Sequence, residues 1–224
     1  MKKLESQLLQ AAVEVQSALT DLGHRFCIIG GLAVSRWGEP RTTQDVDVSL
    51  LVEIGDEQRV SKKVLSRLRP RFPYSLDLAL KQRIILAVAA NDVGVDIALA
   101  SFPFEYRVIE RASSWKLNRT TTITTVSAED LVVLKAFAGR PKDWQDIRGV
   151  LIRQQDKLNW ATIEQELHEL TELRPEEDML GRLTEIRHQI EVTEQPQNVV
   201  TKKPRVPRKA TAPRTKRKNN DPKK

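Results

Sequence analysis

The stretch RTTQDVDVSL, residues 41–50, decides how this chain is interpreted, because it places two carboxylates inside an otherwise apolar β pattern. Side chains alternate along a strand, so Asp45 and Asp47 share one face while the intervening valines and Leu50 take the other. Two like charges at neighbouring positions of one face repel each other. The pattern therefore predicts a strand over residues 44–52 whose acidic face needs something to offset that repulsion.

The chain before and after this strand alternates between helical and extended patterns. Apolar residues spaced by three or four predict an amphipathic helix over 4–21. A short buried strand at 25–29 runs into Gly30-Gly31, and LAVSRW at 32–37 is compatible with a short helix. Residues 58–68 again have helical spacing. This alternation predicts an α/β fold.

A third carboxylate lies in a later strand. Residues 83–89 and 94–100 are two β-rich runs joined by a turn with Asn-Asp and Gly, which predicts a hairpin whose second strand holds Asp96 among apolar neighbours. A polar strand at 120–126 leads to Ser127, which has the pattern of a helix N-cap. Further helices are expected in EDLVVLKAFA (129–138), GRPKDWQDIRGVLIRQQ (139–155), NWATIEQELHEL (159–170) and PEEDMLGRLTEIRHQI (175–190).

Composition sets the class of protein. The 224 residues are 40% hydrophobic and 30% charged, as in a globular protein with one main domain and an appendage. The longest uncharged apolar run, 84–90, is too short to cross a bilayer, and the N-terminus has no signal-peptide pattern. Cys27 has no second cysteine with which to form an internal disulfide. We expect a cytoplasmic protein.

The positive charge is concentrated at the C-terminus. The whole chain carries +7, but residues 202–224 hold eleven Lys or Arg and one Asp, so the remaining 201 residues sum to −3. From about residue 195 the composition is rich in Pro, Lys, Arg and Thr and lacks aromatics, which predicts a disordered basic tail. Clustered basic residues release counterions from phosphate backbones, which favours nucleic-acid contact over a merely solubilising appendage.

Three carboxylates meet at one place if the predicted strands adjoin in one sheet: Asp45, Asp47 and Asp96. Unpaired buried anions are costly, so they must be partly protonated, paired with basic residues, or bound to a divalent metal. Ligation by oxygen alone selects Mg²⁺ or Mn²⁺, which often carries a substrate phosphate. Gly30-Gly31 would let backbone N–H groups approach that phosphate closely.

The motifs resemble a known superfamily. GG at 30–31, R-x-T-x-D-V-D at 41–47 and V-D-I at 95–97 are similar to the signature of the DNA polymerase beta-type nucleotidyltransferases. AEDLVVLKAFAGRPKDWQDI at 128–147 resembles the Lys helix and the [RK]-D-x-x-D-[LI] helix of the AbiEii/AbiGii nucleotidyltransferase toxins. The resemblance covers about residues 26–150. It implies a small mixed-sheet nucleotidyltransferase core with flanking helices.

The resemblance implies a role for each matching residue. Asp45 and Asp47 would bind the metal ions, and Asp96 would complete the site and help to deprotonate the acceptor hydroxyl. Further residues would hold or neutralise the triphosphate: Gly30, Gly31, Arg41 or Thr43, and Lys135. Either Asp143 or Asp146 would be the acidic member of the last motif.

Residue chemistry supports Lys135 independently. It lies four residues after Leu131 and three before Ala138, on the apolar side of its helix, where a lysine is costly unless an anion pairs with it. Each candidate also has an ordinary interpretation. Asp45 and Asp47 would then be solvated acids on an exposed edge strand, and Asp96 would cap a turn. Lys135 would extend its amine to solvent. Asp143 and Asp146 would be acids of the first helical turn, favoured by the helix dipole.

We therefore expect an enzyme with Mg²⁺ or Mn²⁺ that moves an NMP from an NTP to an acceptor and releases pyrophosphate. The toxin resemblance implies tRNA or another RNA as acceptor and a cognate antitoxin as partner. The alternatives are a small-molecule acceptor such as an aminoglycoside, a protein acceptor, or a catalytically idle nucleic-acid-binding relative. The expected divisions are a core with its N-terminal helix (1–126), a C-terminal helical region (127–194) and the basic tail (195–224).

Overall fold

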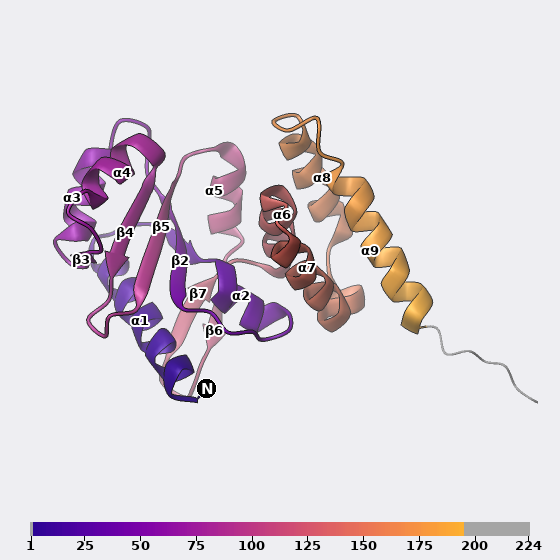
Figure 1. The fold of residues 1–224 in the computed structure, drawn as a ribbon, viewed down its shortest axis with the longest axis horizontal. Coiled ribbons are helices and arrows are strands. Elements are labelled where there is room, and N and C mark those ends of the chain that lie inside the picture. The colour runs from indigo at the N-terminus through magenta and orange to yellow at the C-terminus, as the bar shows by residue number, and fades with distance from the viewer. Residues whose placement is uncertain (1, 195–224) are drawn as a thin grey trace, which may run out of the picture.

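The computed structural model of the protein describes the backbone of residues 2–194 and the side chains of residues 6–193. The predicted disordered basic tail, 195–224, lies outside the described residues. Within the described range the chain forms one seven-stranded mixed sheet with helices packed around it, which confirms the predicted α/β class (Figure 1).

The elements follow the predicted alternation closely. The strands are β1 (Phe26–Ile28), β2 (Asp45–Leu51), β3 (Arg69–Pro70), β4 (Ile84–Val88), β5 (Gly94–Ala100), β6 (Ser113–Lys116) and β7 (Thr122–Thr125). The α-helices are α1 (Lys2–Asp21), α2 (Gly30–Trp37), α3 (Glu57–Leu65), α4 (Ser75–Gln82), α5 (Pro103–Glu110), α6 (Ala128–Ala138), α7 (Pro141–Gln154), α8 (Trp160–Thr171) and α9 (Met179–Glu194).

The strand with the two carboxylates lies at the centre of the sheet. The strand order is β3-β4-β5-β2-β1-β7-β6. β2 pairs in parallel with β5 and antiparallel with β1, and β4 and β5 form the predicted antiparallel hairpin. A central strand cannot present its acids as an edge strand would, so the edge-strand interpretation of Asp45 and Asp47 is wrong.

The alternation along β2 sorts its side chains as predicted, except at Ser49. Val46, Val48 and Leu50 are fully buried, while Asp45 and Asp47 are partly exposed. Ser49 shares the acidic face and is nevertheless buried. The apolar face of β2 therefore belongs to the core, and the N-terminal half of its other face is open.

Two hydrophobic clusters cover the sheet. Buried residues of α1, α3 and α4 pack with those of β2, β4 and β5. A second cluster joins α2 and α5 to the C-terminal helices α6–α9, which lie at one end of the molecule in Figure 1. The acidic residues of β2 line a cavity together with residues of α6 and α7 and with Asp96 of β5. None of the helices in the described part is both long and apolar enough to span a membrane.

A few elements differ from expectation. The helix expected over 58–68 ends at Leu65, because Arg69 and Pro70 leave it to pair with β4. Four of these strands and α-helices were not predicted: β3, α4, α5 and β6. Each is only eight residues long or shorter, so hydrophobic periodicity carries little signal over it.

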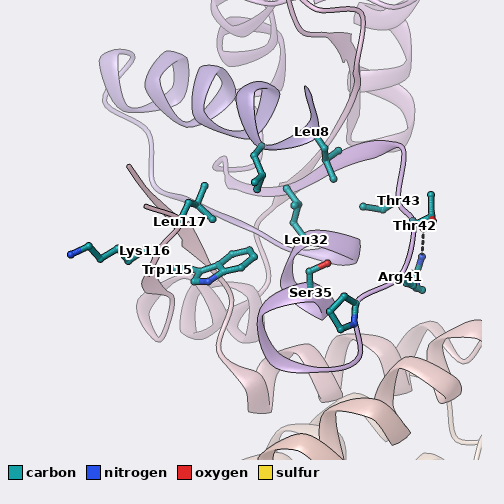
Figure 2. Close-up of a pocket in the computed structure, with 11 residues that line it drawn as sticks. Leu8, Leu32, Ser35, Arg41, Thr42, Thr43, Trp115, Lys116 and Leu117 are labelled. Carbon is teal, nitrogen blue, oxygen red and sulfur yellow. Dashed lines mark hydrogen bonds between the residues drawn. The ribbon is translucent and has the colours of Figure 1, made fainter. Parts of the chain in front are cut away.

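A cavity of about 430 Å³ lies between α1, α2 and β6, beside the segment that enters β2 (Figure 2). Its walls include the apolar side chains of Leu8, Leu32 and Trp115. Arg41 and Thr43 line it and also line the cavity that holds the acidic residues, so the entry segment of β2 separates the two spaces.

Candidate active site

The two glycines bring the backbone against the acidic strand. Gly30 opens α2 with φ +61°, a backbone conformation that favours glycine, and a Cβ atom placed on it would lie 1.9 Å from Asp47 Oδ2. A Cβ atom on Gly31 would lie 2.5 Å from Thr43 Oγ1. A side chain at Gly30 would collide with the side chain of Asp47, and one at Gly31 with the side chain of Thr43. Gly30-Gly31 is therefore required by close approach and not only by a turn.

The sheet register places two of the carboxylates side by side. Asp47 on β2 is directly opposite Asp96 on β5, and Asp45 is opposite Gly94. Parallel neighbours in register share a face, so all three carboxylates lie on the same face of the sheet. The predicted convergence of strands 44–52 and 94–100 is confirmed.

A cavity of about 410 Å³ brings most of the candidate residues together. Asp146 is outside its lining and joins the site through Lys135. The candidates that line it are Gly30, Gly31, Arg41, Thr43, Asp45, Asp47, Asp96, Lys135 and Asp143.

An arginine offsets part of the repulsion between the carboxylates. Arg71 Nη2 lies 2.5 Å from Asp96 Oδ1 and 3.8 Å from Asp45 Oδ1. The side chain is held in place by its Nε, which donates to the carbonyl of Ala87 at 3.3 Å. Asp47 receives only a long hydrogen bond, from the Gly31 N–H at 3.4 Å. The acidic face therefore has one protein cation near two of its members and none in contact with the third.

The environment of Asp47 favours its neutral form. Burial raises the pKa of Asp47, and the negative charges of Asp96 and Asp45 raise it further. The Gly31 N–H and the charge of Lys135 act in the opposite direction but do not cancel the shift. An added cation beside Asp47 would remove this cost of ionisation.

The donor set fits a hard divalent cation. Asp45, Asp47 and Asp96 offer only carboxylate oxygens, which Mg²⁺ and Mn²⁺ prefer, and they line one cavity. Within the described residues, no three acidic, His or Cys side chains are gathered as closely as a bound metal requires. A metal at this place would draw the carboxylates together.

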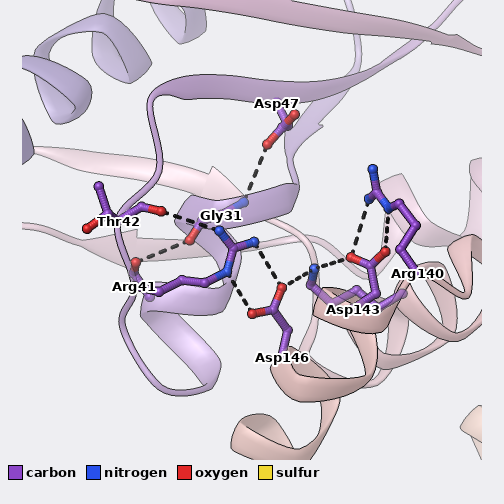
Figure 3. Close-up of polar contacts among 9 residues, drawn as sticks. Gly31, Arg41, Thr42, Asp47, Arg140, Asp143 and Asp146 are labelled. Atoms are coloured by element: carbon purple, nitrogen blue, oxygen red, sulfur yellow. Dashed lines mark hydrogen bonds and ion pairs between the residues drawn. The ribbon is translucent and has the colours of Figure 1, made fainter.

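Lys135 is buried and lies at the centre of an ionic cluster, whose members Arg41, Arg140, Asp143 and Asp146 are labelled in Figure 3. Its Nζ lies 3.0 Å from Asp143 Oδ1 and 2.6 Å from Asp146 Oδ2. Arg140 donates to Asp143 from Nε at 2.5 Å, and Arg41 donates to Asp146 from Nε at 2.7 Å. The interpretation of Lys135 as a solvent-reaching residue is wrong, since its side chain is 7% exposed. Both aspartates contact Lys135, so the structure does not choose between them.

The cluster keeps both aspartates ionised. Burial raises the pKa of Asp143, but hydrogen bonds from Arg140 and Lys135 outweigh it and leave the pKa below its usual value. Burial acts likewise on Asp146, where Arg41 and Lys135 lower the pKa. With both carboxylates ionised, their three basic partners leave one net positive charge on this side of the cavity.

Three basic residues near the site were not singled out from the sequence. Arg140 and Lys142 line the cavity, and Arg71 contacts Asp96. Arg140 and Lys142 flank Pro141 at the start of α7 and lie within three residues of Asp143, so their place in the sequence could have predicted a position near the site. Arg71 had no such signal, because its contact depends on the pairing of β3 with β4.

A family model matches residues 6–193, and its description is nucleotidyltransferase of unknown function (DUF6036). The chain belongs to this family. The match covers the whole sheet and nearly all of the C-terminal helices. The chain is therefore a nucleotidyltransferase, an enzyme that transfers a nucleoside monophosphate from an NTP and releases pyrophosphate.

Solved structures of similar fold include an antigenic nucleotidyltransferase-like protein from Paracoccidioides brasiliensis, 19% identical over 80% of this chain and 93% of that chain, with a TM-score of 0.43. The structure of antibiotic-resistance factor ANT(2″)-Ia is 12% identical over 84% of this chain and 98% of that chain, with a TM-score of 0.46. The structure of CdnC from E. coli MS115-1 with ATP is 15% identical over 86% of this chain and 66% of that chain, with a TM-score of 0.33. A comparison with curated proteins found no match.

Proposed function

We propose that this protein uses Mg²⁺ to transfer an NMP from an NTP to a hydroxyl of an RNA acceptor. One observation carries the proposal: Asp45, Asp47 and Asp96 line a single cavity together with Gly30-Gly31 and Lys135. The carboxylates supply oxygen ligands, the glycines supply close backbone approach, and the basic residues supply positive charge. These are the three requirements of a site for a metal-bound triphosphate.

The residues divide into two sides of the cavity. On the helix side, Lys135, Arg140 and Lys142 neutralise triphosphate oxygens, and Arg41 and Thr43 border the same space. Asp143 and Asp146 orient Lys135 through its ion pairs. On the sheet side, Asp45, Asp47 and Asp96 would hold the metal, whose charge would stabilise the attacking and leaving oxygens.

The transfer itself is an in-line displacement at the α-phosphorus. The acceptor oxygen forms a bond to the α-phosphorus as the bond to the bridging oxygen of the leaving pyrophosphate breaks. The proton of the acceptor hydroxyl passes to Asp96, whose carboxylate is about one-third exposed and faces the cavity. Gly31 N–H is positioned beside Asp47 and close to where the triphosphate would approach.

The resemblance to the AbiEii/AbiGii toxins supports tRNA or another RNA as the acceptor, and a toxin role with a cognate antitoxin protein. The eleven basic residues of 202–224 agree with an RNA acceptor, because they add affinity for phosphate without choosing a sequence. Inducing the protein in a bacterial host tests the toxin role. Wild type should stop growth, and Asp47→Asn should not.

The transfer is tested with the purified full chain, the four α-labelled NTPs, Mg²⁺ and total cellular RNA, followed by gel separation of the labelled species. Wild type should label RNA with at least one NTP, and chelation with EDTA should abolish the label. Asp47→Asn should remove the label because it removes one metal-binding charge at nearly constant side-chain volume.

Asp77→Asn is the matched control, since Asp77 is an exposed acid on the first turn of α4. It should label RNA as wild type does. Label that persists in Asp47→Asn at the wild-type rate would contradict the proposed catalytic role. Label that appears on a small molecule or a protein instead of RNA would keep the chemistry and replace the acceptor.

A further inference from the structure

The segment RLRPRFPY, residues 67–74, approaches the acidic face from the edge of the sheet. β3 is the edge strand, and it pairs with β4 on the side away from α6 and α7 (Figure 1). Arg69 is opposite Val88, and the N–H of Arg71 donates to the carbonyl of Leu86 at 3.0 Å. Two rows therefore cross the sheet from this segment to the carboxylates: Arg69, Val88, Gly94 and Asp45, and Arg71, Leu86, Asp96 and Asp47.

Arg71 connects this segment to the reaction centre through its contact with Asp96. Arg67 and Arg69 alternate with it along the chain and are exposed. Arg69 pairs with Asp92 in the turn of the β4–β5 hairpin, where the two side chains are 62% and 81% exposed. An ion pair this exposed contributes little to stability, so Arg69 can exchange Asp92 for a phosphate at small cost.

Two aromatic rings follow the arginines and face solvent. Phe72 is 37% and Tyr74 52% exposed, and their rings are stacked with centroids 5.2 Å apart and planes 3° from parallel. Buried Ser75 pins the turn, because its Oγ accepts from the Phe72 N–H and donates to the Leu86 carbonyl at 2.7 Å. The two stacked rings therefore form a fixed aromatic surface on an anchored turn, on which a flat ligand can stack.

We propose that segment 67–74 binds the acceptor, and that the acceptor is a single-stranded RNA end. Its bases would stack on Phe72 and Tyr74, its phosphates would contact Arg67 and Arg69, and its terminal hydroxyl would lie beside Asp96. A surface that binds single-stranded RNA needs cations for the phosphates and exposed aromatic rings for the bases, since every base has a face that can stack. A protein partner would not need three arginines along one segment. This inference rests on the proposed function and assigns the acceptor to the sheet side of the site.

The test is binding of a fluorescein-labelled single-stranded RNA 12-mer to the full chain, measured by anisotropy at several salt concentrations. The double variant Phe72→Ala/Tyr74→Ala should raise Kd about tenfold, as expected for the loss of base stacking, with an unchanged salt dependence. Arg67→Gln/Arg69→Gln should also weaken binding, and should flatten the slope of log K against log salt by about one. Wild type and all variants contain the C-terminal segment, so any RNA affinity that this segment adds is the same in every measurement.

Phe102→Ala is the matched control. Phe102 is also an exposed aromatic residue, with 62% of its surface accessible, but it lies outside segment 67–74, at the start of α5. It should bind the RNA as wild type does. Thermal melting should show both aromatic variants folded, since all three rings face solvent. An RNA affinity of Phe72→Ala/Tyr74→Ala equal to that of Phe102→Ala would overturn the inference, including the case in which this surface binds a protein.

Calorimetry with Mg²⁺ and a non-hydrolysable NTP separates this inference from the proposed function. If the nucleotide binds and the aromatic variant keeps its RNA affinity, the acceptor surface is wrong and the transfer chemistry stands. If RNA binding depends on the aromatic rings but no nucleotide binds, the RNA surface stands and the catalytic proposal fails.

Discussion

Helix α6 carries two buried ionic clusters that differ in what surrounds them. The cavity cluster consists of Arg41, Lys135, Arg140, Asp143 and Asp146. The enclosed cluster consists of Arg107, Arg111, Asp130 and Glu166, with Asp130 fully buried and Glu166 2% exposed. Asp130 and Lys135 are only five residues apart on the same helix, yet one lies among α5, α6 and α8 and the other borders the acidic cavity.

The charge balance separates the two clusters. The enclosed cluster pairs two arginines with two buried carboxylates whose charges cancel, and the half-exposed Glu169 at its rim adds a negative charge and no positive one. The cavity cluster has three cations for two carboxylates, and Lys142 adds a further positive charge to the lining. A balanced cluster needs no ligand, whereas an excess of positive charge beside a cavity favours an anion. The two clusters of α6 therefore differ in net charge as well as in burial, and the surplus positive charge lies at the cavity cluster.

The largest expected effect on stability is in the enclosed cluster. Asp130→Ala should lower the free energy of unfolding by about 3 kcal/mol, because it leaves Arg111 beside a buried helix start without its two hydrogen bonds from Nε and Nη2. This corresponds to a fall in Tm of about 6 to 12 °C for a chain of this size. Urea unfolding measures it, and nucleotide binding below the transition should stay at the wild-type level.

Lys135→Met is the matching change in the cavity cluster. Asp143 keeps Arg140 and Asp146 keeps Arg41, so the loss in stability should be smaller, about 1 to 2 kcal/mol. The NTP affinity should fall about tenfold or more, since a phosphate contact is lost. Calorimetry and urea unfolding together test the comparison. Equal NTP affinity in Lys135→Met and Asp130→Ala would show that the surplus charge does not serve the nucleotide.

Asp47→Asn should increase stability while it removes activity. Because the folded state raises the pKa of Asp47 above its ordinary value of 3.8, ionisation of this carboxylate opposes folding at pH 7. Without metal, the variant should melt about 2 °C higher than wild type at pH 7. The difference should disappear as the pH falls below 3.8, where both states bind the proton. Added Mg²⁺ should raise the Tm of wild type more than that of the variant.

Much of the fold followed from local patterns that the structure confirms. The alternation of β2, the turn between β4 and β5, and the Ser127 cap, whose side chain accepts from the Asp130 N–H, are all short-range signals. The convergence of Asp45, Asp47 and Asp96 needed only the assumption that their strands adjoin. Residues whose chemistry is local to one element were therefore predicted from sequence.

Contacts between distant segments were beyond the sequence. Arg71 reaches Asp96 because the edge strand β3 pairs with β4, and nothing in RLRPRFPY alone predicts that pairing. The pairing of Lys135 with both Asp143 and Asp146 depends on the angle between α6 and α7. The same holds for the enclosed cluster, which joins α5 to α6 and α8. Ionic partners were missed where tertiary packing chooses them.

The smallest effect is expected at the rim of the enclosed cluster. Glu169 contacts Arg107 at 2.5 Å, as Glu166 does, but its side chain is 49% exposed whereas that of Glu166 is 3% exposed. Water can therefore solvate Arg107 in place of the Glu169 carboxylate. Glu169→Gln should lower the free energy of unfolding by less than about 0.5 kcal/mol, as measured by urea unfolding. Glu166→Gln should cost several times more, since Glu166 is buried and loses its charge toward both Arg107 and Arg111. If the two variants cost the same, the enclosed cluster would be acting as a diffuse surface network, and its contrast with the cavity cluster would rest on charge balance alone.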